Sequence, residues 1–178
     1  MLDVSVSYNR YKFIGYEFLT WLWYVIENDK DILSDSESPG ALVEIGNRLV
    51  LQNHLTHTVE TITIKGDDAG LEEAYMALQK GAVVTEINLS YKSEEQIWRF
   101  CLKGESLGIS NLKTPDTAPI EKKEDIEGAI LEKGYLYEKL FSFLDKTFNR
   151  FIRLRISEAW STNIVPDIQK WIRSSERK

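Results

Sequence analysis

Four basic residues near the C-terminus have the type and spacing to contact a polyanion. Lys139, Lys146, Arg150 and Arg153 fall within about 60° of one another on an ideal helix, at 100° per residue. A stripe of this kind can follow a phosphate backbone, as in DNA, without reading the bases. The same pattern is typical of an ordinary solvated helix face, so the sequence leaves both interpretations open.

The ligand-capable residues His54 and His57 are followed by Glu60. Imidazole and carboxylate groups can hold a metal ion, but the spacing His-x2-His-x2-Glu matches no strong metal signature. On a strand the two histidines would face opposite sides of the sheet. Exposed loop histidines are the better interpretation, and we expect no metal and no other cofactor.

The sequence makes no positive case for an enzyme. The segment Gly66–Gly70 precedes an expected helix as a phosphate loop does, but its two aspartates would repel phosphate, and no Lys-Ser/Thr pair follows. Helix capping explains these aspartates better. The carboxylates are scattered along the chain, whereas a two-metal nuclease needs several that converge.

One further basic residue, Arg155, lies on the apolar arc of its helix with Phe148 and Phe151. A guanidinium in such surroundings needs a partner or a route to water. Glu17 is an acid in an otherwise apolar helix. We therefore expect a structural ion pair between Glu17 and Arg155.

The element that should organise these groups is a helix predicted over Phe13–Glu27, which is apolar on almost every side. An isolated surface helix would show a single apolar stripe. Trp21 and Trp23 are about 160–200° apart on an ideal helix, so burying both requires cover on two sides. A central core helix or an oligomer interface provides that cover. A membrane span does not, because the run from Phe18 to Ile26 is shorter than the ~20 residues that a bilayer needs.

Length and charge restrict the class of protein. The 178 residues fit one domain, and the formal charge of −6 is not that of a globally basic nucleic-acid binder. Residues 135–178 nevertheless carry nine basic and five acidic residues, a net charge of +4. A single cysteine, Cys101, allows no intrachain disulfide. Residues 1–12 are polar without an apolar run, so we expect no signal peptide, no membrane partner and a cytoplasmic location.

The hydrophobic periodicity predicts an α+β fold with a mostly antiparallel sheet, a buried aromatic N-terminal helix and a long C-terminal helix. We expect an α+β domain over residues 1–134 and a helical segment over 135–178 packed on the same domain. Gly46-Asn47 suits a tight turn between two short strands, and Pro166 should end or kink the long helix. The expected strands are 41–44, 48–52, 59–65, 82–91 and 95–103, with an additional edge strand at 106–110. The later helices are 71–80, a helical pattern from Glu124 onward whose clean part is 135–156, and 167–173.

Several segments, in order, resemble the RdgC-like family of recombination-associated bacterial proteins, particularly the C-terminal portion of its longer members. Each segment alone is mostly an apolar pattern, and their order is the more specific signal. The segments are Phe13–Tyr24 (FIGYEFLTWLWY), Glu44–Leu51 (EIGNRLVL), Leu71–Leu89 (LEEAYMALQKGAVVTEINL), Leu112–Pro115 (LKTP) and Glu132–Arg155, which ends in FNRFIRLR.

The resemblance implies an α+β protein that binds DNA without sequence preference, forms a ring-like dimer around it and limits access of the RecA recombinase. Some members are described as exonucleases, which no residue here supports. The chain departs from the family in its acidic charge and in lacking the N-terminal half of full-length members, so ring closure does not transfer. The resemblance implies that Lys146, Arg150 and Arg153 contact phosphate groups.

Three functions follow from the sequence. The leading expectation is a non-enzymatic, RdgC-like DNA-associated protein linked to recombination, acting as a homo-oligomer. The alternative is an oligomeric assembly module without DNA binding, and a nuclease is the weakest of the three. Binding to DNA that falls steeply with salt would separate the first from the second.

Overall fold

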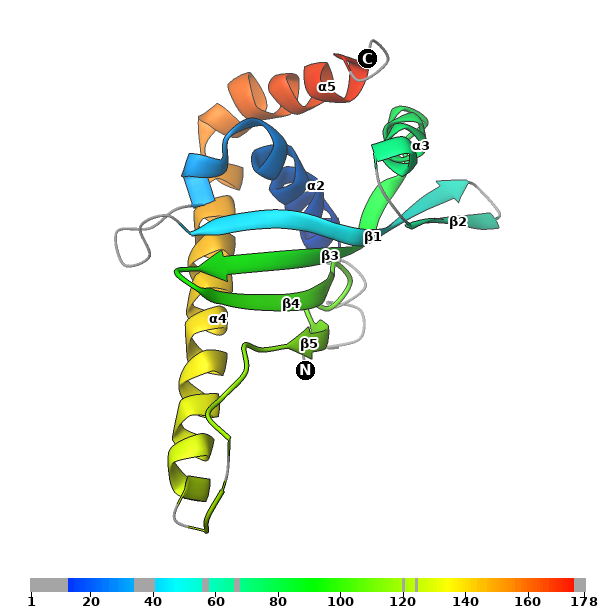
Figure 1. Ribbon diagram of the computed structural model, residues 1–178. Helices are drawn as coiled ribbons and strands as arrows, with labels where there is room; N and C mark the ends of the chain where they lie inside the picture. The colour runs from blue at the N-terminus through cyan, green and yellow to red at the C-terminus, as the bar shows by residue number, and fades with distance from the viewer. Residues whose placement is uncertain are drawn as a thin grey trace, which may run out of the picture.

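The computed structural model describes residues 13–33, 41–55, 58–65, 68–119, 121–123 and 125–174. Within these ranges five strands form one antiparallel sheet in the order β2-β1-β3-β4-β5, with helices packed against it (Figure 1). This is the α+β fold expected from the sequence.

The strands lie in the middle of the chain, and helices come before, among and after them. In chain order the elements are α2 (Phe13–Asn28), η1 (Lys30–Leu33), β1 (Leu42–Leu55), β2 (Thr58–Lys65), α3 (Asp68–Gln79), β3 (Val83–Ser93), β4 (Gln96–Lys103), β5 (Ile109–Lys113), α4 (Asp125–Arg155), the π-helical turn η2 (Trp160–Ile164) and α5 (Val165–Ser174).

One expectation was wrong: β1 is a single strand, and Gly46-Asn47 is not a turn between two strands. The register between β1 and β3 shifts between Ile45 and Leu49, so the chain bulges here. Because β3 pairs with β1 on both sides of the bulge, the segment stays extended. Gly46 permits the close approach, since a Cβ there would lie 3.1 Å from Asn88 Cβ.

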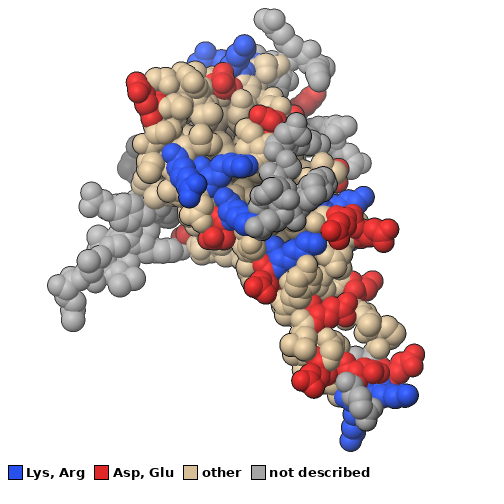
Figure 2. Space-filling model, turned by 90° about the vertical axis from the view of Figure 1, so that its left-hand side faces the viewer, with Lys and Arg blue, Asp and Glu red and all other residues tan. Residues whose placement is uncertain are grey.

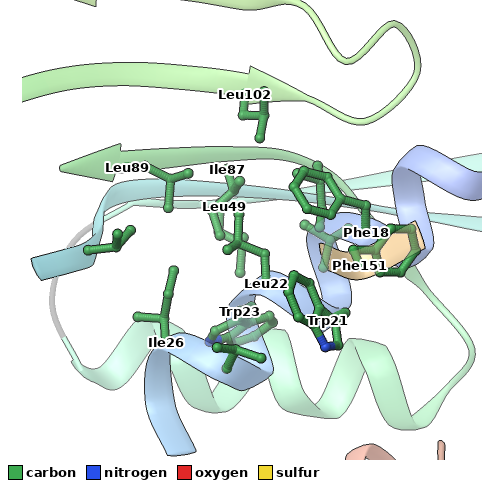
Figure 3. Close-up of a cluster of buried hydrophobic side chains, with 14 of the residues drawn as sticks. Phe18, Trp21, Leu22, Trp23, Ile26, Leu49, Ile87, Leu89, Leu102 and Phe151 are labelled. Atoms are coloured by element: carbon green, nitrogen blue, oxygen red, sulfur yellow. The ribbon is translucent and has the colours of Figure 1, made fainter. Parts of the chain in front are cut away.

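Alternating residues of β3 and β4 form the inner face of the sheet. From β3, Ile87, Leu89 and Tyr91 are buried, and β4 adds the buried side chains Trp98, Phe100 and Leu102. Leu22 and Ile26 of α2 lie beneath Leu49, Ile87 and Leu89 in the same cluster (Figure 3).

The helix α2 is covered on both flanks, as its two tryptophans require. Trp21 is 1% exposed and packs against Phe151 of α4 at 5.5 Å between ring centroids. Trp23 is fully buried and packs against Tyr75 of α3 at 5.1 Å and Trp171 of α5 at 5.2 Å. Both tryptophans are therefore core residues of this chain. Within the described ranges, no helix has the length and apolarity to cross a membrane.

Glu27, at the end of α2, joins three helices by accepting hydrogen bonds from three aromatic side chains. Trp23 Nε1 donates to Glu27 Oε1 at 2.5 Å, and Trp171 Nε1 donates to Glu27 Oε2 at 3.0 Å. Tyr75 Oη also donates to Oε2. Burial, followed by the bond to Glu27, raises the pKa of the Tyr75 phenol well above its usual value.

The helical pattern expected from Glu124 onward is confirmed. α4 begins at Asp125 and contains both Gly128 and Gly134. It ends at Arg155, before Pro166 rather than because of it, and Ser157 Oγ donates to the Leu154 carbonyl there. Pro166 instead lies where η2 passes directly into α5, just after the π-type hydrogen bond from the Val165 N–H to the Trp160 carbonyl.

The start of α2 packs backbone to backbone against the turn after β4, and this contact yields a stability prediction. A Cβ on Gly15 would lie 1.8 Å from the carbonyl oxygen of Gly104, a clash that no side-chain movement relieves. We expect Gly15→Ala to reduce the free energy of unfolding by at least about 3 kcal/mol in urea denaturation.

Gly128→Ala is the matched control, because a Cβ at Gly128 of α4 would meet nothing within 4 Å. That substitution should stabilise the protein by about 0.5–1 kcal/mol through helix propensity. Equal effects of the two substitutions would contradict the packing described.

Candidate phosphate-binding groove on α4

The four basic residues singled out by the sequence line one groove. Lys139, Lys146, Arg150 and Arg153 border a depression of about 930 Å³ along α4, together with the carboxylate of Glu138. The groove also contacts Tyr91 of β3 and Leu33 of η1, so it lies where α4 meets the body of the protein.

Packing of the neighbouring arc of α4 against the core fixes the direction in which these cations point. Leu136, Leu140 and Phe151 of α4 are buried, and Phe151 lies 5.3 Å from Phe18 of α2 between ring centroids. Phe143 stacks on Tyr91 at 4.2 Å. Phe143 lies only about 20° from Arg150 around the helix, so the cations lie beside the line where α4 meets the sheet and border the groove there.

The four cations are not equivalent. Lys139 is half-buried, donates from Nζ to Gln96 Oε1 at 3.1 Å, and lies 5.6 Å from the centre of the Trp98 ring. It therefore serves partly to attach α4 to β4. Lys146, Arg150 and Arg153 are exposed.

Arg150 and Arg153 have the greater freedom to bind a ligand, since neither forms an ion pair within the described part of the chain. The nearby Asp145 carboxylate accepts a hydrogen bond from Asn149 Nδ2 at 3.0 Å. Lys and Arg side chains gather on the middle of this face, whereas the protruding part carries several carboxylates (Figure 2). The basic surface is thus local in an acidic protein.

Arg155 forms the ion pair expected from the sequence and lies outside the groove. Its Nε donates to Glu17 Oε2 at 2.6 Å, and its guanidinium lies 5.4 Å from the centre of the Trp160 ring. About a third of each charged side chain is exposed, so the pair contributes at most about 1 kcal/mol. Its role is to position the end of α4 against α2.

The other sequence candidates provide no site. His57 and the side chain of His54 lie outside the described residues, as does Asp67 before α3. Among the residues that are described, no group of three or more His, Cys, Asp or Glu side chains could hold a metal ion.

Gly104–Gly108 matches the Gly-x-Ser-x-Gly letters of a hydrolase nucleophile elbow. Such an elbow joins a strand to a helix, whereas this segment connects β4 to β5. The Oγ of Ser106 accepts a hydrogen bond from the Gly108 N–H at 3.2 Å. The segment therefore matches the motif in sequence but not in structure.

Sequence reasoning missed an exposed apolar stripe on the N-terminal half of α4, the part that extends past the sheet in Figure 1. Ile126, Ile130, Tyr137 and Phe141 are each at least 38% exposed and fall within about 60° on the helix. Tyr137 and Phe141 stack at 6.4 Å. We call these four residues the α4 seam. In the sequence, these four apolar residues are separated by three to four residues or multiples of that spacing, and this pattern could have indicated the stripe.

Comparison with known proteins gives no match to this chain among family models, curated proteins or solved structures.

Proposed function

We propose that this protein is a non-enzymatic, RdgC-like DNA-associated protein that binds the phosphate backbone without sequence preference and acts in recombination. The observation that supports it most is the convergence of Lys146, Arg150 and Arg153, all exposed, on one groove of an acidic chain. The link to recombination rests on the family resemblance of the sequence.

The length of the row of cations formed by Lys146, Arg150 and Arg153 suits contact with a phosphate backbone. Lys146 to Arg153 spans seven residues of α4, which is about 10 Å of helix axis. A DNA strand presents a phosphate about every 3.4 Å of duplex axis, so three cations can contact about three phosphates. Contacts of this kind position a protein on DNA but carry no base information.

A second function, assembly with another copy of this chain, is favoured by the α4 seam. The seam continues the stripe of Leu144 and Phe148 that packs against α2, where Phe148 lies 5.1 Å from Phe18. Gly134 lies beside the seam with nothing within 4 Å of a Cβ placed there, which allows a second helix to approach closely. Two copies of α4 can cover each other's seam, as coiled-coil helices do.

DNA binding is tested by reversing two charges of the groove. We expect affinity for a short fluorescent duplex, measured by anisotropy, to fall with salt with a log–log slope of about −3 for three phosphate contacts. Arg150→Glu with Arg153→Glu should flatten that slope to about −1 or abolish binding.

Lys170→Glu with Arg173→Glu is the matched control, because both residues are exposed on α5 and the change in net charge is the same. It should leave the slope unchanged. Absence of wild-type binding at low salt, or equal loss in both double variants, would overturn the proposal.

Assembly is tested by placing charge in the seam. Ile130→Glu with Phe141→Glu should convert an oligomer into a monomer in sedimentation equilibrium, because two carboxylates would be buried without partners. Leu131→Glu is the control: Leu131 is 69% exposed but lies about 100° around α4 from Ile130. A wild-type monomer at high concentration, or an oligomer that survives the double substitution, would contradict the role of the seam.

A further inference from the structure

An exposed aromatic side chain borders the groove on α4 beside its cations. Tyr135 is 57% exposed and lines the groove together with Lys139 and Lys146. At 100° per residue, Tyr135 lies within about 60° of all four cations around the helix axis. It lies at least about 120° from the α4 seam, so a second copy seated on the seam would leave this ring uncovered.

The ring of Tyr135 has no aromatic or polar partner within the described part of the chain. Among those residues, no ring contact, cation–π contact or side-chain hydrogen bond involves it. Tyr137, two positions further on, instead stacks on Phe141 at 6.4 Å, and Tyr75 and Tyr91 pack against other rings. An aromatic ring with an open face can take a second planar group by stacking.

The groove also has an apolar lining beside its cationic border. Phe143 and Leu154 both line it and are half-buried, and its volume of about 930 Å³ is large enough for a base. A duplex turns its phosphates outward and keeps its bases stacked inside, so it offers no planar group to an exposed ring. The bases of an unpaired strand can turn out and stack on aromatic side chains.

We propose that the groove binds single-stranded DNA in preference to duplex, with one base stacked on Tyr135 while the cations hold the backbone. This inference rests on the proposed DNA binding and names the form of DNA that the same groove takes. Tyr135 and Arg153 are 18 residues apart on α4, which is about 27 Å of helix axis. That length suits about four nucleotides, the lower end of the site sizes of single-strand binders. Every base has a π-face, so the stacking adds affinity without sequence preference.

Fluorescence anisotropy of the full chain with labelled probes of equal length tests the preference. The probes are an oligothymidylate, an abasic strand that keeps the phosphates but lacks the bases, and a duplex. We expect the oligothymidylate to bind more tightly than the duplex, and about five- to 150-fold more tightly than the abasic strand, the range for one stacked base. Tyr135→Leu should remove the difference between the two strands, whereas Tyr135→Phe, which keeps the ring, should retain it.

Tyr137→Leu is the matched control, because Tyr137 is also exposed but lies about 160° from Tyr135 around α4. Leucine keeps the seam apolar, so this variant should bind all probes like the wild type. Salt dependence separates stacking from phosphate contact: Tyr135→Leu should weaken oligothymidylate binding without changing the log–log slope, which is about −2 for three phosphates of a single strand. The Arg150→Glu, Arg153→Glu variant should change that slope.

Failure of this inference and failure of DNA binding give different results. If no probe bound at low salt, the proposed DNA binding would be wrong and the preference with it. If DNA bound through Arg150 and Arg153 but the duplex or the abasic strand bound as tightly as the oligothymidylate, only the preference would be overturned. Unchanged oligothymidylate affinity in Tyr135→Leu would likewise overturn the stacking and leave the DNA binding intact.

Discussion

The structure depends on one constraint: α2 is apolar around most of its circumference and must be covered on several sides. Trp21 and Trp23 point to opposite flanks, and each is at most 1% exposed. Burying a tryptophan removes about 150–250 Å² from water, worth roughly 4–6 kcal/mol. The sheet covers one side of α2, α4 covers the Trp21 flank, and α3 with α5 covers the Trp23 flank. Glu27 accepts hydrogen bonds from the indole N–H and phenol O–H groups that this aromatic packing would otherwise leave without an acceptor.

The same constraint determines what α4 presents to solvent. Its apolar arc packs against Phe18 and Trp21, which leaves the arc with Lys146, Arg150 and Arg153 outside. Beyond the sheet no other element of the described chain covers the continuation of the apolar arc, and the seam becomes exposed. A single helix thus carries a cationic groove and, farther toward its N-terminus, an exposed apolar stripe. The two proposed functions are compatible, because they use different arcs.

The features that follow from periodicity and side-chain chemistry could be predicted from the sequence. The burial of both tryptophans, the inward face of β4 and the Glu17–Arg155 pair each follow from which residues share one face of an element. The continuity of β1 could not be predicted, because Gly46-Asn47 suits a turn as well as a bulge and the pairing with β3 decides between them. The contact of the groove with Leu33 and Tyr91 depends on segments distant in sequence from α4, which no local pattern encodes.

The proposed function requires that the core hold α4 so that its cationic arc contacts DNA. The most direct measurement is an NMR titration of the labelled protein with a short duplex, following backbone amides and arginine side chains. The largest shifts should map to Lys146, Arg150 and Arg153 and the adjoining turn of α4, with the core around Trp21 and Trp23 unchanged. Shifts confined to another surface, such as the outer face of the sheet around Arg99, or no shifts at low salt, would contradict it.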